Sequence, residues 1–317
     1  MQDYAPGHFV RTHEVAADRL AAALDGIDRR AMGAYWDMTN GNVLRSELQD
    51  LQNELLDFAA AHVGPEPALA APEAHASLLT AAECALGLLS LGCFPDGDWD
   101  VRLPLIGQTL ESERHTYQEA RDPWRTAATA RTWTDAFGLC LISDLIWDRS
   151  KMIGPLLQGD YAPTIRDGVP YSRWESPSSA ADLAEMDALA MYLHVVRPER
   201  SPWVAQGPVP VRRPDAESRA RAAAQLDAAG ELSPDQQLVR VLLDDDRASF
   251  EHALVGRLVA YRTEMDAEPA PAVRSLLPVS TVTLAVLAVL AHGWQLNATS
   301  DYVPAGLLRV PQQTATN

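Results

Sequence analysis

Apolar residues recur at intervals of three and four along most of the 317-residue chain, whereas the strict alternation of a half-buried strand is rare. Only residues 98–110 and 295–303 look extended. The pattern predicts an all-α protein, a multi-helix array of antiparallel helices in two packed lobes with at most short β-hairpin elements. The predicted helices cover residues 11–32, 42–62, 72–93, 108–120, 132–151, 180–196, 214–229, 234–244, 247–265 and 279–292.

Several of these helices carry start and stop signals. Thr132 followed three residues later by Asp135 is typical of a capping box, and so is Ser233 followed by Gln236, with a proline in the first turn. Gly230 predicts a left-handed stop for the helix that precedes it. These signals fix the expected ends of the helices near residues 132, 229 and 234.

Proline density suggests where the chain divides. Five prolines fall between residues 197 and 214, a composition typical of a linker. We therefore predict an N-terminal helical lobe (1–197), a Pro-rich linker (198–213) and a C-terminal helical lobe (214–317), with the two lobes packed as one unit.

The charge balance limits the kinds of partner. The chain has 26 basic and 43 acidic residues and a formal net charge of −17. A nucleic-acid ligand is not expected, because phosphate binding needs a basic surface. An acidic protein favours a basic partner, although simple solubility explains the same composition.

The sequence favours a cytoplasmic protein. The three cysteines are an odd number for a disulfide framework and fit a reducing compartment. The first residues lack the basic and apolar regions of a signal peptide. The apolar run from Val279 to Ala291 is short for a membrane span and contains three hydroxyl residues, so we predict a buried helix and no membrane association.

The predicted helix 42–62 has two faces. Its leucines form an apolar stripe at helical spacing. Acidic residues repeat at the same spacing on another face, and like charges placed this way repel each other. We predict a docking face for a basic partner there; an ordinary solvated face is the alternative. The residues of this acidic stripe are Glu47, Asp50, Glu54 and Asp57.

Three apolar helical runs each hold one ionisable residue. Glu83 is the only charge between His75 and Asp96, Asp144 is the only one between Asp135 and Asp148, and His292 follows the apolar run 284–291. An isolated buried charge is costly, so each must be paired, neutral or placed at a cavity. Pairing with an arginine such as Arg166 or Arg173 would lock helix packing. A shared polar pocket with shifted pKa values is the functional alternative.

Residues 160–175 are predicted to form a loop rich in aromatic and charged side chains, after the apolar helix that contains Asp144. Such side chains usually contact a partner. The partner-binding candidates in this loop are Tyr161, Arg166, Arg173 and Trp174.

No motif for a metal, a phosphate, a dinucleotide or a catalytic nucleophile is present, so no metal and no cofactor is expected. The run Asp244–Asp246 lacks the alternating ligands and the glycine of a calcium loop. It lies where two predicted helices meet, and we expect Asp245 or Asp246 to cap the second helix.

Several blocks together resemble the immunity protein 49 family, and the resemblance extends from about residue 10 to residue 308. Each block alone is only moderately specific. The blocks are Leu79-Thr-Ala-Ala-Glu-Cys-Ala-Leu-Gly-Leu88, Gly92-Cys-Phe-Pro-Asp-Gly97, Thr132-Trp-Thr-Asp-Ala-Phe137, residues 160–173, Leu242-Leu-Asp-Asp-Asp246 and His292-Gly-Trp294.

The resemblance implies a mostly α-helical cytosolic protein that neutralises a cognate polymorphic toxin, often a nuclease. It brings no established catalytic residues. A cognate toxin protein is therefore the expected partner, and an acidic or polar face is expected to bind it.

An enzyme or enzyme subunit of small-molecule (natural-product) biosynthesis is the second hypothesis. Its pocket would contain Glu83, Asp144, Arg166, Arg173 and His292. Paired arginines suit a small anionic metabolite. Candidate proton-transfer groups are Glu83, Asp144, His292, Tyr161 and Tyr171.

Overall fold

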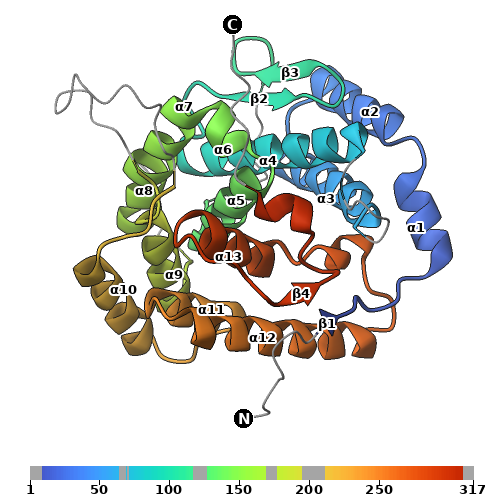
Figure 1. Cartoon of the computed structure of the whole chain (residues 1–317). Coiled ribbons are helices and arrows are strands. Elements are labelled where there is room, and N and C mark those ends of the chain that lie inside the picture. The colour runs from blue at the N-terminus through green and yellow to red at the C-terminus, as the bar shows by residue number, and fades with distance from the viewer. Residues whose placement is uncertain are drawn as a thin grey trace, which may run out of the picture.

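The computed structural model describes residues 9–63, 69, 71–116, 127–168, 177–194 and 211–309. Helices dominate, and the all-α prediction is confirmed. One buried apolar core runs from the first helices to the last (Figure 1).

The N-terminal half is built around α4 (Pro72–Cys93), whose sequence is apolar on every side. A helix of this kind is stable only when its neighbours cover it all round. α3 (Arg45–Ala61), α5 (Ala130–Ile142) and a β-hairpin pack against it, and most of its residues are buried. Two further helices, α1 (Ala17–Leu24) and α2 (Ile27–Asn40), pack on α3.

α5 is the second central helix and contacts both halves of the chain. It packs against α4, α9 (Ala180–Ala190) and α13 (Val279–Leu290). Short helical elements connect α5 to α9: α6 (Leu145–Asp148), α7 (Ser150–Pro155), the π-helix η2 (Leu156–Tyr161) and α8 (Ala162–Asp167).

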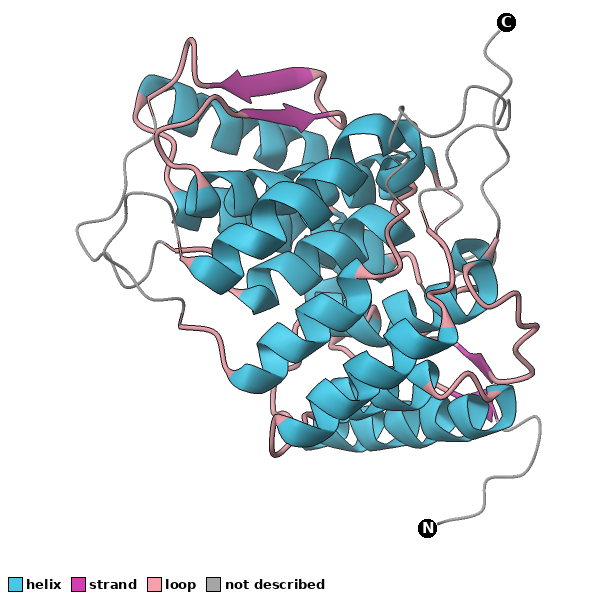
Figure 2. Cartoon of the chain, turned by 90° about the vertical axis from the view of Figure 1, so that its left-hand side faces the viewer, coloured by secondary structure: helices cyan, strands magenta, loops and turns pink. Residues whose placement is uncertain are grey.

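α13 is the most apolar of the C-terminal helices, and α11, α12 and η5 pack against it. Figure 2 shows the β-hairpin at the top of the molecule, and α12 runs along the opposite end, at the bottom of Figure 1. The elements here are α10 (Ala216–Ala228), α11 (Pro234–Leu243), α12 (Arg247–Ala267) and the 3-10 helices η4 (Val273–Leu276) and η5 (Ala305–Leu308).

Both stretches that looked extended contain a strand. β2 (Asp100–Leu103) pairs with β3 (Gln108–Glu111) in an antiparallel hairpin, so the helix expected over 108–120 is wrong at its start; residues 117–120 lie outside the described part. β4 (Thr299–Ser300) pairs in parallel with β1 (Phe9–Val10), which joins the two ends of the described chain.

Two long predicted helices are interrupted. The segment 11–32 contains α1 and the start of α2, separated at Gly26, whose φ of 53° is left-handed. The segment 132–151 contains α5, α6 and the start of α7, and the break occurs at Asp144, with a φ of 65°. Apolar period continues across both breaks, which is why it did not reveal them.

The predicted caps are partly right. Ser233 and Gln236 form the expected capping box of α11, and Gly230 has a left-handed φ of 97°. Asp246 caps α12, accepting from the N–H of Ala248. The box predicted at Thr132 is wrong, because α5 begins earlier and Thr129 is its cap, with Thr132 as the reciprocal partner.

Elements of the two predicted lobes are in direct contact. α13 packs on α5, α10 and α11 pack on α9, and η4 packs on α3. Most of the predicted linker (198–213) lies outside the described residues, so the division into lobes stays a prediction. At its end Val211 bridges Leu193 in an antiparallel pair, and the N–H of Arg212 donates to the carbonyl of Tyr192 at 2.8 Å.

Two helical stretches, Pro72–Cys93 and Val273–Leu290, are long and apolar enough to cross a membrane by length and composition alone. Within the fold 78% of the first and 61% of the second is buried. Such burial is typical of core helices, which can have the same length and apolar composition as membrane spans.

Candidate functional site

Glu83 is paired with an arginine, although not with either of the two that the sequence suggested. Its carboxylate is 3% exposed, and the Nη1 of Arg149 lies 2.8 Å from Oε2 and 2.9 Å from Oε1. Arg149 lies at the junction of α6 and α7. Burial raises the pKa of Glu83, and the positive charge of Arg149 opposes that rise.

Asp144 is half-buried at the junction between α5 and α6, and not inside one continuous helix as expected. Burial raises the pKa of its carboxyl, while His75 lowers it. The suggested partner Arg166 donates instead to Asp187 of α9. Arg173 lies outside the described residues.

His292 follows α13 and is held by two polar neighbours. Its Nε2 lies 2.9 Å from the hydroxyl of Tyr192, and its Nδ1 lies 2.7 Å from Oδ1 of Asp245. Trp294 packs on the imidazole, with 4.6 Å between ring centroids. Burial lowers the pKa of His292, so the ring is neutral at pH 7 and accepts from the tyrosine while donating to the aspartate.

Asp245 also binds two arginines. Its Oδ2 lies 2.9 Å from Nη2 of Arg219 and 3.2 Å from Nη1 of Arg213. Burial by itself would raise the pKa of Asp245, but the hydrogen bond from His292 and the two guanidinium groups hold it below its usual value. The aspartate therefore remains ionised and serves as the centre of this cluster.

Sequence reasoning did not predict this arrangement. Local pattern predicts a helix cap at the Asp244–Asp246 run and an isolated group at His292, and it gives no signal at Tyr192. One signal was available, because Asp245 and His292 both lie in blocks that resemble the same family. Pairing across 47 positions cannot be read from periodicity.

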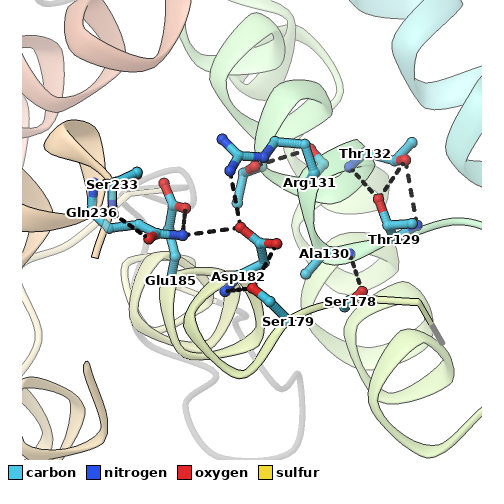
Figure 3. A network of polar contacts seen from close by, with 11 residues as sticks. Thr129, Ala130, Arg131, Thr132, Ser178, Ser179, Asp182, Glu185, Ser233 and Gln236 are labelled. Carbon is cyan, nitrogen blue, oxygen red and sulfur yellow. Dashed lines mark hydrogen bonds and ion pairs between the residues drawn. The ribbon is translucent and has the colours of Figure 1, made fainter. Parts of the chain in front are cut away.

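Figure 3 shows a second polar cluster, between α5, α9 and α11. Arg131 and Gln236 both donate to Oδ1 of Asp182 at 3.0 Å, and Gln236 also donates to Glu185 at 3.1 Å. Glu185 is 4% exposed. Burial raises its pKa to about 7, against the lowering effect of the hydrogen bond from Gln236.

The acidic stripe of α3 is not a uniform solvated face. Asp57 accepts from the N–H of Arg274 at 2.6 Å and from its guanidinium at 3.0 Å, and Glu54 pairs with Arg30 at 3.1 Å. Asp50 is exposed, and Glu47 is half-buried. Two of the four negative charges are therefore balanced within the protein.

Residues 160–167 are helical, which corrects the loop predicted there. Tyr161 is buried against Phe94, with ring centroids 5.9 Å apart, and burial raises the pKa of its hydroxyl. Tyr171, Arg173 and Trp174 lie outside the described residues, so their predicted contacts stay untested.

The residues of the alternative pocket have separate partners. Glu83 binds Arg149, Arg166 binds Asp187, and His292 binds Asp245 and Tyr192. In the part of the chain that the structure describes, no group of three or more histidine, cysteine or acidic side chains is arranged to hold a metal ion.

Comparison with known proteins gives one positive finding. No curated protein and no solved structure matches the chain. The family model described as immunity protein 49 matches residues 66–307, a range that includes Glu83, Asp245 and His292. Because this match covers most of the 317 residues, the chain belongs to the immunity protein 49 family.

Proposed function

We propose that this protein binds a cognate, basic, nuclease-like bacterial toxin in the cytoplasm and neutralises it. The family match carries the proposal. The net charge of −17 supports it, because an acidic protein attracts a basic partner and speeds their encounter.

The outer face of α2 and the adjoining α3 is the surface that best suits such a partner. Trp36 of α2 is 56% exposed, and tryptophan is one of the residue types enriched at interface hot spots. Its neighbour Asp37 is exposed, as is Asp50 of α3. α2 and α3 pack against each other, so an exposed aromatic residue and exposed carboxylates lie on two adjoining helices.

Fewer acidic side chains are available to a partner on α3 than the sequence pattern predicts. Asp57 is committed to Arg274, and Glu54 is bonded to Arg30. Asp37 and Asp50 have no such ion pair among the described residues, so their charges are available to a partner. The proposed contact residues are therefore Trp36, Asp37 and Asp50.

The test uses the toxin encoded beside this gene, purified as an inactive variant. Titration calorimetry with the wild-type protein should show saturable binding that weakens as NaCl rises from about 50 to about 300 mM. Asp37→Arg with Asp50→Arg should weaken binding and remove most of its salt dependence. Trp36→Ala should weaken binding at least about fivefold, the effect of losing an interface anchor.

Glu231→Arg is the matched control. Glu231 is exposed in the connection between α10 and α11. In Figure 1, α10 and α11 are drawn at the lower left and α2 at the upper right. Its reversal changes net charge without touching the proposed surface, so it should have little effect on affinity. Equal losses in the control and in the α2–α3 variant would contradict the proposed surface. No binding of the wild-type protein would contradict toxin neutralisation itself.

A further inference from the structure

A cationic pocket lies between the end of α9 and the start of α10. It has a volume of about 510 Å³. Three of its lining side chains are arginines, which is unusual on a chain with 43 acidic and 26 basic residues. The residues that concern its chemistry are Met191, Leu193, His194, Arg212, Arg213 and Arg219.

Backbone pairing fixes Arg212 close to the start of α10. The N–H of Arg212 donates to the carbonyl of Tyr192 at 2.8 Å, and Val211 bridges Leu193. Asp215 then caps α10, accepting from the N–H of Ser218 at 2.8 Å. The pocket thus lies at the N-terminus of a 13-residue helix, beside the capping carboxylate of Asp215 and the arginine side chains.

Arg219 also lines the pocket. Its side chain is mostly buried, and its Nη2 lies 2.9 Å from Oδ2 of Asp245. Its Nε–H is buried and has no hydrogen-bond acceptor within the described structure. A buried donor without an acceptor is costly, so an oxygen-bearing ligand that reached this group would be favoured.

The carboxylates at the pocket do not cancel its charge. The carboxylate of Asp215 accepts hydrogen bonds from the N–H and the hydroxyl of Ser218. The carboxylate of Asp245 binds two arginines and His292. The three arginines that line the pocket thus outnumber the two carboxylates, of which only Asp215 lines it. Burial and the charge of Arg212 lower the pKa of His194, so this ring is a neutral hydrogen-bonding group at pH 7.

We infer that this pocket binds a phosphate group, either as free phosphate or as the phosphate of a small organic ester. Guanidinium groups match the geometry of phosphate oxygens and bind them with charge-assisted hydrogen bonds. Met191 and Leu193 add an apolar wall beside the arginines, which suits the organic part of an ester. The site is independent of the surface proposed for the toxin.

The pocket is connected to the His292 cluster through Asp245. A phosphate that binds Arg213 competes with Asp245 for the same guanidinium, because Arg213 is only 3.2 Å from that carboxylate. Weaker neutralisation of Asp245 would strengthen its interaction with His292. Phosphate binding should therefore shift the ring resonances of His292, a group that does not line the pocket.

The experiment titrates the purified protein with inorganic phosphate and with phenyl phosphate at constant ionic strength. Calorimetry measures affinity, and ¹⁵N-labelled histidine NMR follows the ring of His292. We expect saturable binding of at least one probe with a shift at His292. Tighter binding of phenyl phosphate identifies an ester as the preferred ligand, and equal or tighter binding of inorganic phosphate identifies the free anion.

Arg212→Ala is the test variant, because the side chain of Arg212 makes no ion pair among the described residues and its loss should not affect folding. It should weaken binding about tenfold, as for one lost charge-assisted hydrogen bond. Arg29→Ala is the matched control, since Arg29 is exposed on α2 and does not line the pocket. Equal losses in both variants, or no saturable binding of either probe, would overturn the inference.

Discussion

The Nη1 of Arg149 lies within 2.9 Å of both carboxylate oxygens of Glu83, and the two side chains are 13% and 3% exposed. This buried ion pair fastens the central helix α4 to the junction of α6 and α7. Removing two charges from water is costly, and the pair repays that cost only while both partners are present. Glu83 and Arg149 therefore depend on each other.

Substitutions of the two partners should lower the free energy of unfolding by different amounts. Arg149→Ala leaves a buried carboxylate unpaired and should lower the free energy of unfolding by about 3–5 kcal/mol. Glu83→Gln should cost less, because the amide remains neutral and its oxygen still accepts from Arg149. The double variant Glu83→Leu with Arg149→Met should recover much of the loss, since it buries no charge. Urea unfolding at pH 7 measures all three.

A double variant as unstable as Arg149→Ala alone would mean that shape, and not charge pairing, dominates at this position. Adding the single variants Glu83→Leu and Arg149→Met completes a double-mutant cycle, which separates the energy of the pair from the contributions of the individual side chains.

The raised pKa of Glu185 predicts that the free energy of unfolding depends on pH. Its pKa is about 7 in the folded protein and near 4.5 when unfolded. Between these values the folded state holds a proton that the unfolded state has lost, so stability falls as pH rises. The stabilisation that protonated Glu185 contributes is fully present below pH 4.5 and is lost above pH 7. The difference amounts to roughly 3 kcal/mol at most.

Glu185→Gln isolates this effect. The amide cannot ionise, and its oxygen can still accept from Gln236. Unfolding free energies of the variant and the wild type, measured from pH 5 to pH 8, should therefore diverge, with the variant gaining relative stability as pH rises. A constant difference across this range would show that Glu185 titrates normally in the folded protein.

The aspartate beside His292 gives a third prediction. Asp245 raises the pKa of His292 against the lowering effect of burial. Asp245→Asn removes that negative charge, so the pKa of His292 should fall further. Asparagine also tolerates the left-handed φ of 60° at this position, which limits backbone strain. An NMR titration of the ring measures the change, and a raised pKa would contradict the assigned role of Asp245.

The sequence predicted the helices best where local signals were complete. α4 has the expected limits of 72 and 93, because Pro72 suits a first turn and the apolar run is continuous. The break at Asp144 was missed, since apolar residues continue on both sides of it and a left-handed residue other than glycine leaves no periodic trace. Local pattern thus predicts helices better than the joints between them.

The candidate site shows the same limit more strongly. A lone acid in an apolar run predicts that Glu83 needs a partner, because an unpaired buried charge is costly. The partner is Arg149, 66 positions away, and it is selected by how the helices pack. His292 and Asp245 also meet only through the fold. Sequence reveals which buried groups need partners, whereas tertiary packing decides their identity.

Two helical glycines should respond oppositely to alanine. Gly33 of α2 is exposed, and a Cβ built there has no atom within 4 Å. Gly92 of α4 is buried, and a Cβ there would lie 2.7 Å from the backbone nitrogen of Ala128. Alanine normally stabilises a helix by about 1 kcal/mol relative to glycine, because it loses less backbone freedom on folding. That gain should appear at Gly33.

At Gly92 the clash should reverse the sign. The segment at Ala128 is bound to α4, since its N–H donates to the carbonyl of Gly92 at 3.2 Å, and it cannot move away without breaking this contact. Gly92→Ala should therefore lower the free energy of unfolding by about 1–3 kcal/mol, the usual cost of overpacking. Urea unfolding of both variants checks the pair. Stabilisation by Gly92→Ala would show that α4 and the segment at Ala128 are less closely packed than the structure has them.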